Sequence, residues 1–160
     1  MKQAIQILEF HKIKQTVESL CASSLGLKRV ALLMPSTHEK QVEYTLNQSD
    51  EALKIILALG EAPLGGVSDI TEPIKRAKIS ALLSANELLS ISRLLYAVSQ
   101  LKAFSDRLTD IKVEAPIFMS QVDSLVSLNR LQSAINDCID ETGSVLDSAS
   151  PELRTIRRAI

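Results

Sequence analysis

Apolar residues recur at intervals of three and four positions along almost the whole chain, and no stretch of useful length alternates apolar with polar residues. Intervals of three and four place side chains on one face of an α-helix, whereas a half-buried strand needs strict alternation. The pattern therefore predicts an all-α fold. With 160 residues, of which 46% are hydrophobic, the chain is long enough for one domain with a core of its own.

Two segments, residues 37–59 and 84–108, are expected to form the longest helices. Each begins at or directly after a serine that a glutamate follows three positions later, the spacing of a capping box, and Gly60 is placed to end the first helix. We expect the two helices to lie antiparallel and to pack through their leucine and isoleucine faces within an irregular multi-helix array. The serine–glutamate pairs are Ser36 with Glu39 and Ser84 with Glu87. The apolar faces are Val42, Leu46, Leu53 and Ile56 in the first helix, and Leu88, Ile91, Leu95, Val98 and Leu101 in the second.

Shorter helices are expected before, between and after the two long ones. A polar connection is predicted between Asp110 and Pro116, and Gly143 is available for a left-handed turn in "DETGS". The expected short helices cover residues 10–20, 24–34, 70–79 and 125–138.

The C-terminal stretch has the features that begin a helix. Ser150 is a favourable N-cap, Pro151 fits the first helical position, and Glu152 suits the positive end of the helix dipole. A helix of about ten residues is marginal without packing, so we expect its final turn to fray. Its apolar stripe consists of Leu153, Ile156 and Ile160.

The glycine-rich segment "GEAPLGG" resembles a phosphate-binding loop only in part. Gly60 and Gly65 have the required spacing, but Gly66 stands at the lysine position and Pro63 removes a backbone donor. We interpret the segment as the end of a helix followed by a turn.

Histidine and cysteine form no catalytic or metal-binding pattern. In "HEKQV", His38 starts a zinc-protease sequence, but Val42 takes the place of the second histidine. We therefore expect His38 in a first helical turn and His11 at a solvated position. Cys21 and Cys138 lie on or near apolar faces, where a free cysteine acts as a small hydrophobe. We predict no catalytic and no metal-binding residue in the chain.

The charge balance argues against a free-standing nucleic-acid-binding protein. The formal net charge is −1, and aromatic residues, which would stack on bases, make up only 3% of the chain. The candidate contacts to nucleic acid or a partner are Lys75, Arg76 and Lys78, and Arg154, Arg157 and Arg158. A solvated helix face is the alternative interpretation of both groups. Without a targeting segment, and with two cysteines that form no disulfide pattern, the chain is expected in the cytoplasm.

Four strings resemble the N-terminal region of the second bacterial type of the MutS family, which lacks the mismatch-recognition domain. They are "LEFHKI" from Leu8, "PLGGVSDI" from Pro63, "LSANELL" from Leu83 and "IDETGSVLDSASPELRTIRRAI" from Ile139. The resemblance covers nearly the whole chain in order, and the last string is long and specific. His11 departs from the acidic residue expected after "LEF".

This resemblance implies that residues 1–148 are the helical N-terminal part of a MutS-like core domain and that residues 149–160 begin a lever helix running out to a clamp. The clamp, the ATPase domain and the nuclease domain would then be partners within the same polypeptide. The intact protein would be an ATP- and Mg-dependent homodimer and an endonuclease. It would act on branched DNA, suppress homologous recombination, bind rRNA and split collided ribosomes.

The segment itself would be a non-catalytic scaffold without a cofactor. Two other hypotheses remain open. One is a self-contained helical protein-interaction module, in which the C-terminal helix docks on the body. The other is a small nucleic-acid-binding regulator, against which the balanced charge argues.

Overall fold

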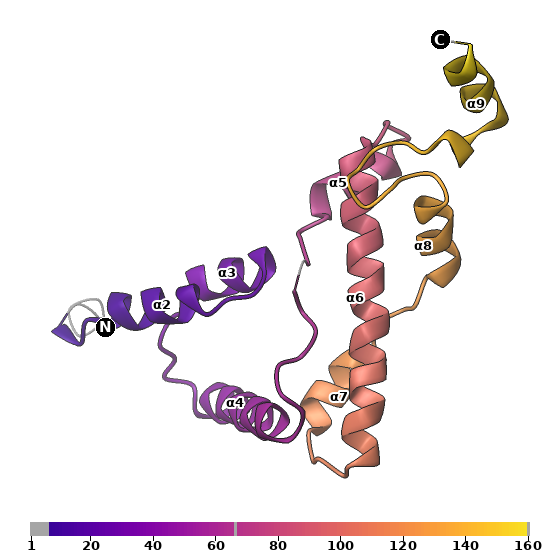
Figure 1. Cartoon of the computed structure of the whole chain (residues 1–160). Coiled ribbons are helices and arrows are strands. Elements are labelled where there is room, and N and C mark those ends of the chain that lie inside the picture. Colours follow the sequence, from indigo (N-terminus) through magenta and orange to yellow (C-terminus); the bar gives the residue numbers. More distant parts are fainter. Residues whose placement is uncertain (1–6, 66, 160) are drawn as a thin grey trace.

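The computed structural model describes residues 7–65 and 67–159 as an open array of helices (Figure 1). Eight α-helices and one 3-10 turn make up its regular structure, which confirms the all-α fold. The described ranges hold no strand, and an isolated antiparallel bridge joins Ile139 and Val145. The elements are α2 (Phe10–Ser19), α3 (Ser24–Ala31), α4 (Glu39–Leu59), α5 (Thr71–Lys78), α6 (Ala85–Asp110), α7 (Pro116–Asp123), α8 (Asn129–Asn136), η1 (Asp147–Ala149) and α9 (Pro151–Arg158).

Helix α6 is the axis of the molecule, and each of its ends has its own hydrophobic cluster. At its C-terminal end, Phe104 and Leu108 pack with Ile55 of α4 and with Ala115, which precedes α7. Phe104 also meets Phe118 edge to face, with ring centroids 6.3 Å apart. This cluster holds α4, α6 and α7 together at the lower end of Figure 1.

The second cluster lies at the N-terminal end of α6. Ile91 packs against Ile135 of α8 and against Ile139, and the half-buried Leu95 borders the same cluster. The buried Ser92 reinforces the contact by donating to Asn136 Oδ1 at 2.6 Å. Leu95 therefore packs toward α8, which is not the neighbour predicted for it.

The expected antiparallel pairing of the two long helices is wrong. Their bounds are close to those predicted, but α4 crosses α6 steeply, so that α4 is seen nearly end-on in Figure 1 while α6 runs vertically. The two helices meet near Ile55 and Leu59, in the C-terminal part of α4, and α7 packs against both of them. The predicted apolar face of α4 does not take part, and its side chains Val42, Leu46, Leu53 and Ile56 are exposed.

One of the two predicted capping boxes is present. Ser84 Oγ accepts from Glu87 N at 3.4 Å, and Glu87 Oε2 accepts from Ser84 N at 2.8 Å. The box predicted for Ser36 is wrong, because α4 begins at Glu39 and His38 occupies the N-cap. Ser36 Oγ instead accepts from His38 N at 3.2 Å, which closes a turn just before the helix.

The connection after α6 differs most from the prediction. Pro116 was expected in a polar linker, but it is the first residue of α7. Leu125 and Leu128 were expected inside a helix, yet α8 starts only at Asn129. A short non-helical stretch therefore separates two eight-residue helices where one helix was predicted.

Helices α2 and α3 form a hairpin that stands apart from the body (Figure 1). Lys14 Nζ donates to the carbonyl oxygen of Ala31 at 2.6 Å and closes the hairpin. Lys28 forms an ion pair with Asp69, just before α5, and so ties the hairpin to the body. The Lys28 ammonium, together with Thr71, holds the pKa of Asp69 well below its ordinary value.

The turn at "DETGS" is confirmed, with Gly143 at φ +85. A Cβ atom on Gly143 would clash with the side-chain oxygen of Asn86, so the glycine also lets the turn approach α6 closely. Arg93 of α6 secures the same turn by donating to the carbonyl oxygen of Glu141 at 3.1 Å.

Candidate nucleic-acid or partner interface

Two of the three basic residues of α5 are engaged by carboxylates. Lys75 Nζ lies 2.7 Å from Glu72 Oε1, and this hydrogen bond raises the pKa of Lys75. Arg76 pairs with Glu87, the glutamate of the α6 capping box, and so fixes α5 to the start of α6. Among the described residues, no carboxylate lies within ion-pair distance of Lys78.

The basic residues of α9 also differ in whether a carboxylate engages them. Arg157 donates to Asp147 Oδ1 at 2.5 Å and to the carbonyl oxygen of Val145 at 2.9 Å, so it holds α9 against the preceding turn. Arg154 and Arg158 are exposed and form no ion pair within the described part of the chain. Ser150 is the predicted N-cap, and its Oγ accepts from Leu153 N at 3.1 Å.

The two basic groups lie toward the same end of the molecule but on different elements (Figure 1). The main contacts of α9 are with η1, and α9 extends beyond the rest of the array. Ile156 of its apolar stripe is 58% exposed, and Ile160 lies outside the described residues. The structure thus leaves Lys78, Arg154 and Arg158 available for contacts, without joining them in one built site.

Two carboxylates lie beside Arg154 and Arg157 of α9. A shallow hollow beside the helix is lined by Arg154 and Arg157, but also by Asp140 and Asp147. The pKa of Asp140 is lowered, chiefly because its carboxylate accepts from the Thr142 hydroxyl and from backbone N–H groups of the turn. The two carboxylates balance the two arginines, so the hollow itself has no excess positive charge for a phosphate group.

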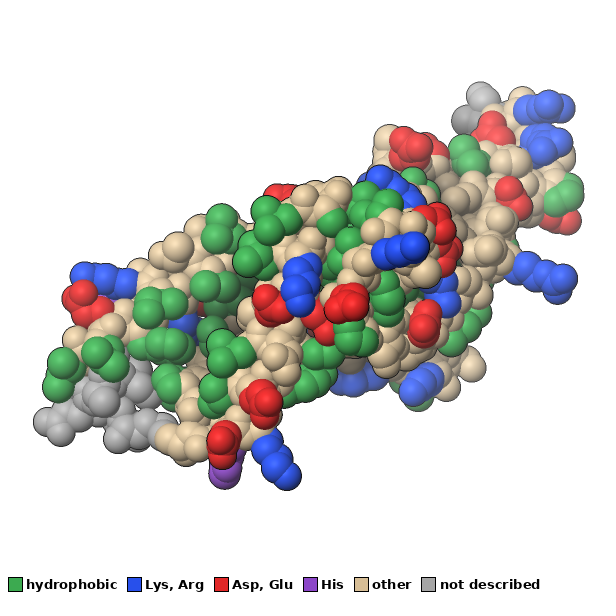
Figure 2. Space-filling view, turned by 90° about the horizontal axis from the view of Figure 1, so that it is seen from below, with side chains coloured by type: hydrophobic (Ala, Val, Ile, Leu, Met, Phe, Trp, Pro, Cys, Tyr) green, Lys and Arg blue, Asp and Glu red, His purple; other side chains and the backbone are tan. Residues whose placement is uncertain are grey.

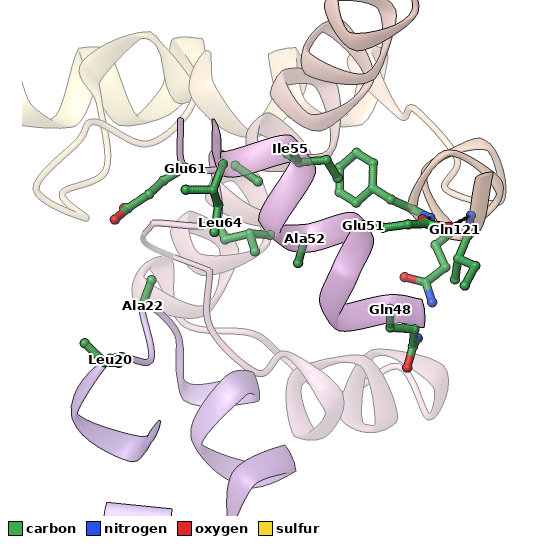
Figure 3. A pocket seen from close by; sticks show the side chains of 13 residues that line it. Leu20, Ala22, Gln48, Glu51, Ala52, Ile55, Glu61, Leu64 and Gln121 are labelled. Atoms are coloured by element: carbon green, nitrogen blue, oxygen red, sulfur yellow. Dashed lines mark hydrogen bonds between the residues drawn. The ribbon is translucent and has the colours of Figure 1, made fainter. Parts of the chain in front are cut away.

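A larger groove of about 610 Å³ opens between α4, α7 and the loop after α4 (Figure 3). Its walls are mostly apolar, with Ala52 and Ile55 on α4 and Leu64 on the loop. Leu20 and Ala22, at the end of the α2–α3 hairpin, face it from the other side. The ionisable side chains of the lining are Glu51 and Glu61, and the lining contains no histidine, cysteine, lysine, serine or threonine.

Glu51 is the buried carboxylate of this groove, and its role is structural. Its Oε1 accepts from Ile117 N at 3.1 Å, and its Oε2 accepts from Phe118 N at 2.9 Å. These N–H groups belong to the first turn of α7, which has no side-chain cap of its own. Sequence reasoning missed this contact because 66 residues separate Glu51 from Ile117.

The residues present do not fit a nucleotide. The loop after α4 leaves the C-terminal end of that helix, with Gly60 at φ +81, and does not lead directly into a helix N-terminus that could hold a phosphate. Within residues 7–65 and 67–159, no three metal-ligating side chains gather in one place. In the same ranges, no helix is long and apolar enough to cross a membrane.

Comparison with known proteins finds relatives that match the chain over its whole length. It is 41% identical over 160 residues to Endonuclease MutS2 of Bacillus cereus (strain Q1), which covers 100% of this chain and 20% of that protein. Endonuclease MutS2 of Bacillus anthracis gives the same values. Endonuclease MutS2 of Bacillus mycoides (strain KBAB4) is 42% identical over the same coverage. The chain thus spans about one fifth of the length of these curated relatives, and no family model matches it.

Proposed function

Because the chain belongs to the MutS2 family and corresponds to 20% of the length of its relatives, we propose that it is a scaffold segment of a longer MutS-family protein. In this role the helices transmit mechanical force and position other domains, and they catalyse no reaction.

The observation that carries this proposal is the large exposed surface. A compact monomer of this mass exposes about 7,900 Å². This chain exposes 11844 Å², and many of its leucines and isoleucines face solvent. A segment that packs against further parts of its own polypeptide would show this excess, whereas a finished small domain would not.

For the intact protein we propose the activities that the family resemblance implies. These are ATP hydrolysis with Mg, endonuclease action and homodimer formation in the cytoplasm. The proposed targets are branched DNA, through which recombination is suppressed, and the rRNA of collided ribosomes, which are split. The name of the relatives, Endonuclease MutS2, supports the nuclease activity of those proteins.

Within that protein we propose two roles for this segment. Helix α6, held by a hydrophobic cluster at each end, would transmit movement as a rigid rod. Residues 149–160 would begin the lever helix, and Lys78, Arg154 and Arg158 would be the basic side chains that reach nucleic acid or a partner.

The first test concerns chemistry. We expect the purified 160-residue chain to hydrolyse no ATP and to cut no branched DNA, because its described residues form neither a phosphate cradle nor a group of three metal-ligating side chains. The full-length polypeptide, assayed in parallel for phosphate release and strand cleavage, is expected to do both. ATP turnover by the 160-residue chain that a point substitution within it abolishes would refute the scaffold role.

Hydrogen exchange separates the lever hypothesis from a self-contained interaction module. Helix α9 contacts mainly η1 and exposes Ile156, so its amides are expected to exchange much faster than those of α6 in the dilute 160-residue chain. Ser150→Ala should speed this exchange further, since the loss of an N-cap costs about 1 kcal/mol. Protection of α9 as strong as that of α6, in a monomer, would favour the module.

A further inference from the structure

Helix α4 carries a second apolar face, opposite to the side that packs on α6 and α7. Its residues follow one another at alternating intervals of four and three, which is the spacing of a coiled-coil seam. Leu46 and Leu53 are 64% and 55% exposed, although leucines at such positions are usually the most buried of a helix. We call this face the α4 seam. It consists of Val42, Leu46, Ser49, Leu53 and Ile56.

The form of the seam indicates what would cover it. Alternating intervals of four and three keep side chains on a narrow line that another helix can follow, with each side chain fitting between those of the partner. The seam spans two heptads, a length of roughly 20 Å along the helix. Exposed hydrophobic side chains gather over α2, α3 and α4 on the face shown in Figure 2. The seam also meets the groove of Figure 3, since Ile56 belongs to both.

Charges beside the seam indicate the character of the partner. Glu43 and Asp50 occupy the flanking position directly after Val42 and Ser49, where coiled coils place the residues that choose a partner. A helix with Lys or Arg at its facing positions would complement them, and at Asp50 it would compete with the exposed ion pair that Lys54 Nζ forms with Asp50 Oδ2 at 2.7 Å. In an antiparallel pair of two copies, the flanking carboxylates of one α4 would face those of the other, and their repulsion disfavours that arrangement.

The extent of exposed surface indicates where the partner comes from. The excess over a compact monomer is roughly 4,000 Å², whereas a standard complex of two proteins buries only about 800 Å² on each side. The chain corresponds to 20% of the length of its relatives, so most of a full-length relative lies outside these residues. Packing within one polypeptide accounts for an uncovered surface of this size.

We propose that the α4 seam is covered, in the longer protein, by an amphipathic helix of the same polypeptide from outside these 160 residues. The covering helix has an apolar seam of its own, flanked by Lys or Arg side chains opposite Glu43 and Asp50. This inference rests on the proposed function in taking the chain as a segment of a longer protein, and it adds the surface and the kind of element that meets it.

Site-specific photo-crosslinking in the full-length polypeptide tests the proposal. A benzophenone amino acid at Leu53 is expected to react with a residue beyond the 160-residue stretch within the same molecule, so that the product keeps the mass of the monomer. The same probe at Lys40, which is exposed on α4 away from the seam, is the matched control and should react several-fold less. Peptide mapping should place the product in a helix with basic residues beside its apolar seam.

Charge reversal gives an independent measurement. Asp50→Lys, in the protein that carries the probe at Leu53, should lower the crosslink yield several-fold, while Lys40→Glu should leave it unchanged. A crosslinked dimer would show that a second copy covers the seam, and a yield no higher than that of the Lys40 control would show that it stays open. Either result overturns the proposal. The measurement needs neither nucleotide nor DNA, so its failure is distinct from a failure of the ATPase and nuclease assays.

Discussion

Leu108→Ala is expected to lower the free energy of unfolding by about 2–5 kcal/mol, the range found when a buried leucine is truncated. Leu108 is 0% exposed, and it packs with Ile55, Phe104 and Ala115 in the cluster that joins α4, α6 and α7. Its removal leaves a cavity that the neighbours cannot fill without moving the helices. In a chain with so much exposed surface, a loss of this size is a large share of the total stability.

Urea unfolding followed by far-UV circular dichroism measures the effect. The matched control is Leu82→Ala, because Leu82 is 92% exposed and its truncation should change the free energy of unfolding by less than about 0.5 kcal/mol. If both variants unfold at the same urea concentration as the parent chain, the lower cluster does not hold the array together.

Local sequence features predicted several of the helix ends, although not those of α4, α7 and α8 at their N-termini. The Ser84–Glu87 capping box, the Ser150 N-cap and the positive φ of Gly60 and Gly143 are all present. Each depends on residues within a few positions of one another, so its physical cause lies entirely in a short stretch of sequence. The helical period likewise predicted the all-α fold and the two longest helices.

The packing of those helices was not predictable in the same way. Periodicity shows that α4 has an apolar face, but it does not say which element covers that face or whether any element in this chain does. The side of α4 that is buried here includes the charged Glu51, so a search for apolar stripes selects the opposite side. Helix α7 was missed for a related reason, since the carboxylate that satisfies its first turn comes from α4.

For the candidate interface, too, contacts between elements could not be predicted from the sequence. Composition identified the basic residues of α5 and α9, but not their partners. Arg76 is engaged by a glutamate that begins another helix, and Arg157 by Asp147 of the preceding turn. Only the fold distinguishes these structural cations from Lys78, Arg154 and Arg158, which remain available for contacts. That these six form a nucleic-acid or partner interface stays a prediction.

Glu51→Ala is expected to lower the free energy of unfolding by about 2–4 kcal/mol. Each hydrogen bond to a charged group contributes about 1.5–3 kcal/mol, and two are lost. The variant no longer has to bury a carboxylate, and the desolvation free energy saved in this way offsets part of the loss. The substitution leaves the N–H groups of Ile117 and Phe118 without their acceptor at a part-buried helix end. It also removes negative charge from the positive end of the α7 dipole. The amides of α7 should therefore exchange faster than those at the N-terminal end of α6.

Two matched variants separate the cap from a general effect of charge on α4. Glu51→Gln keeps one acceptor oxygen at the same reach, so its loss of stability should be about half that of Glu51→Ala. Glu43→Ala removes an exposed carboxylate from the same helix and should change the free energy of unfolding by less than about 0.5 kcal/mol. Equal losses for Glu51→Gln and Glu51→Ala would mean that the carboxylate charge alone matters. If neither lowers stability, α7 does not depend on a cap supplied by α4, and the angle between α4 and α6 must be fixed by the hydrophobic cluster around Leu108.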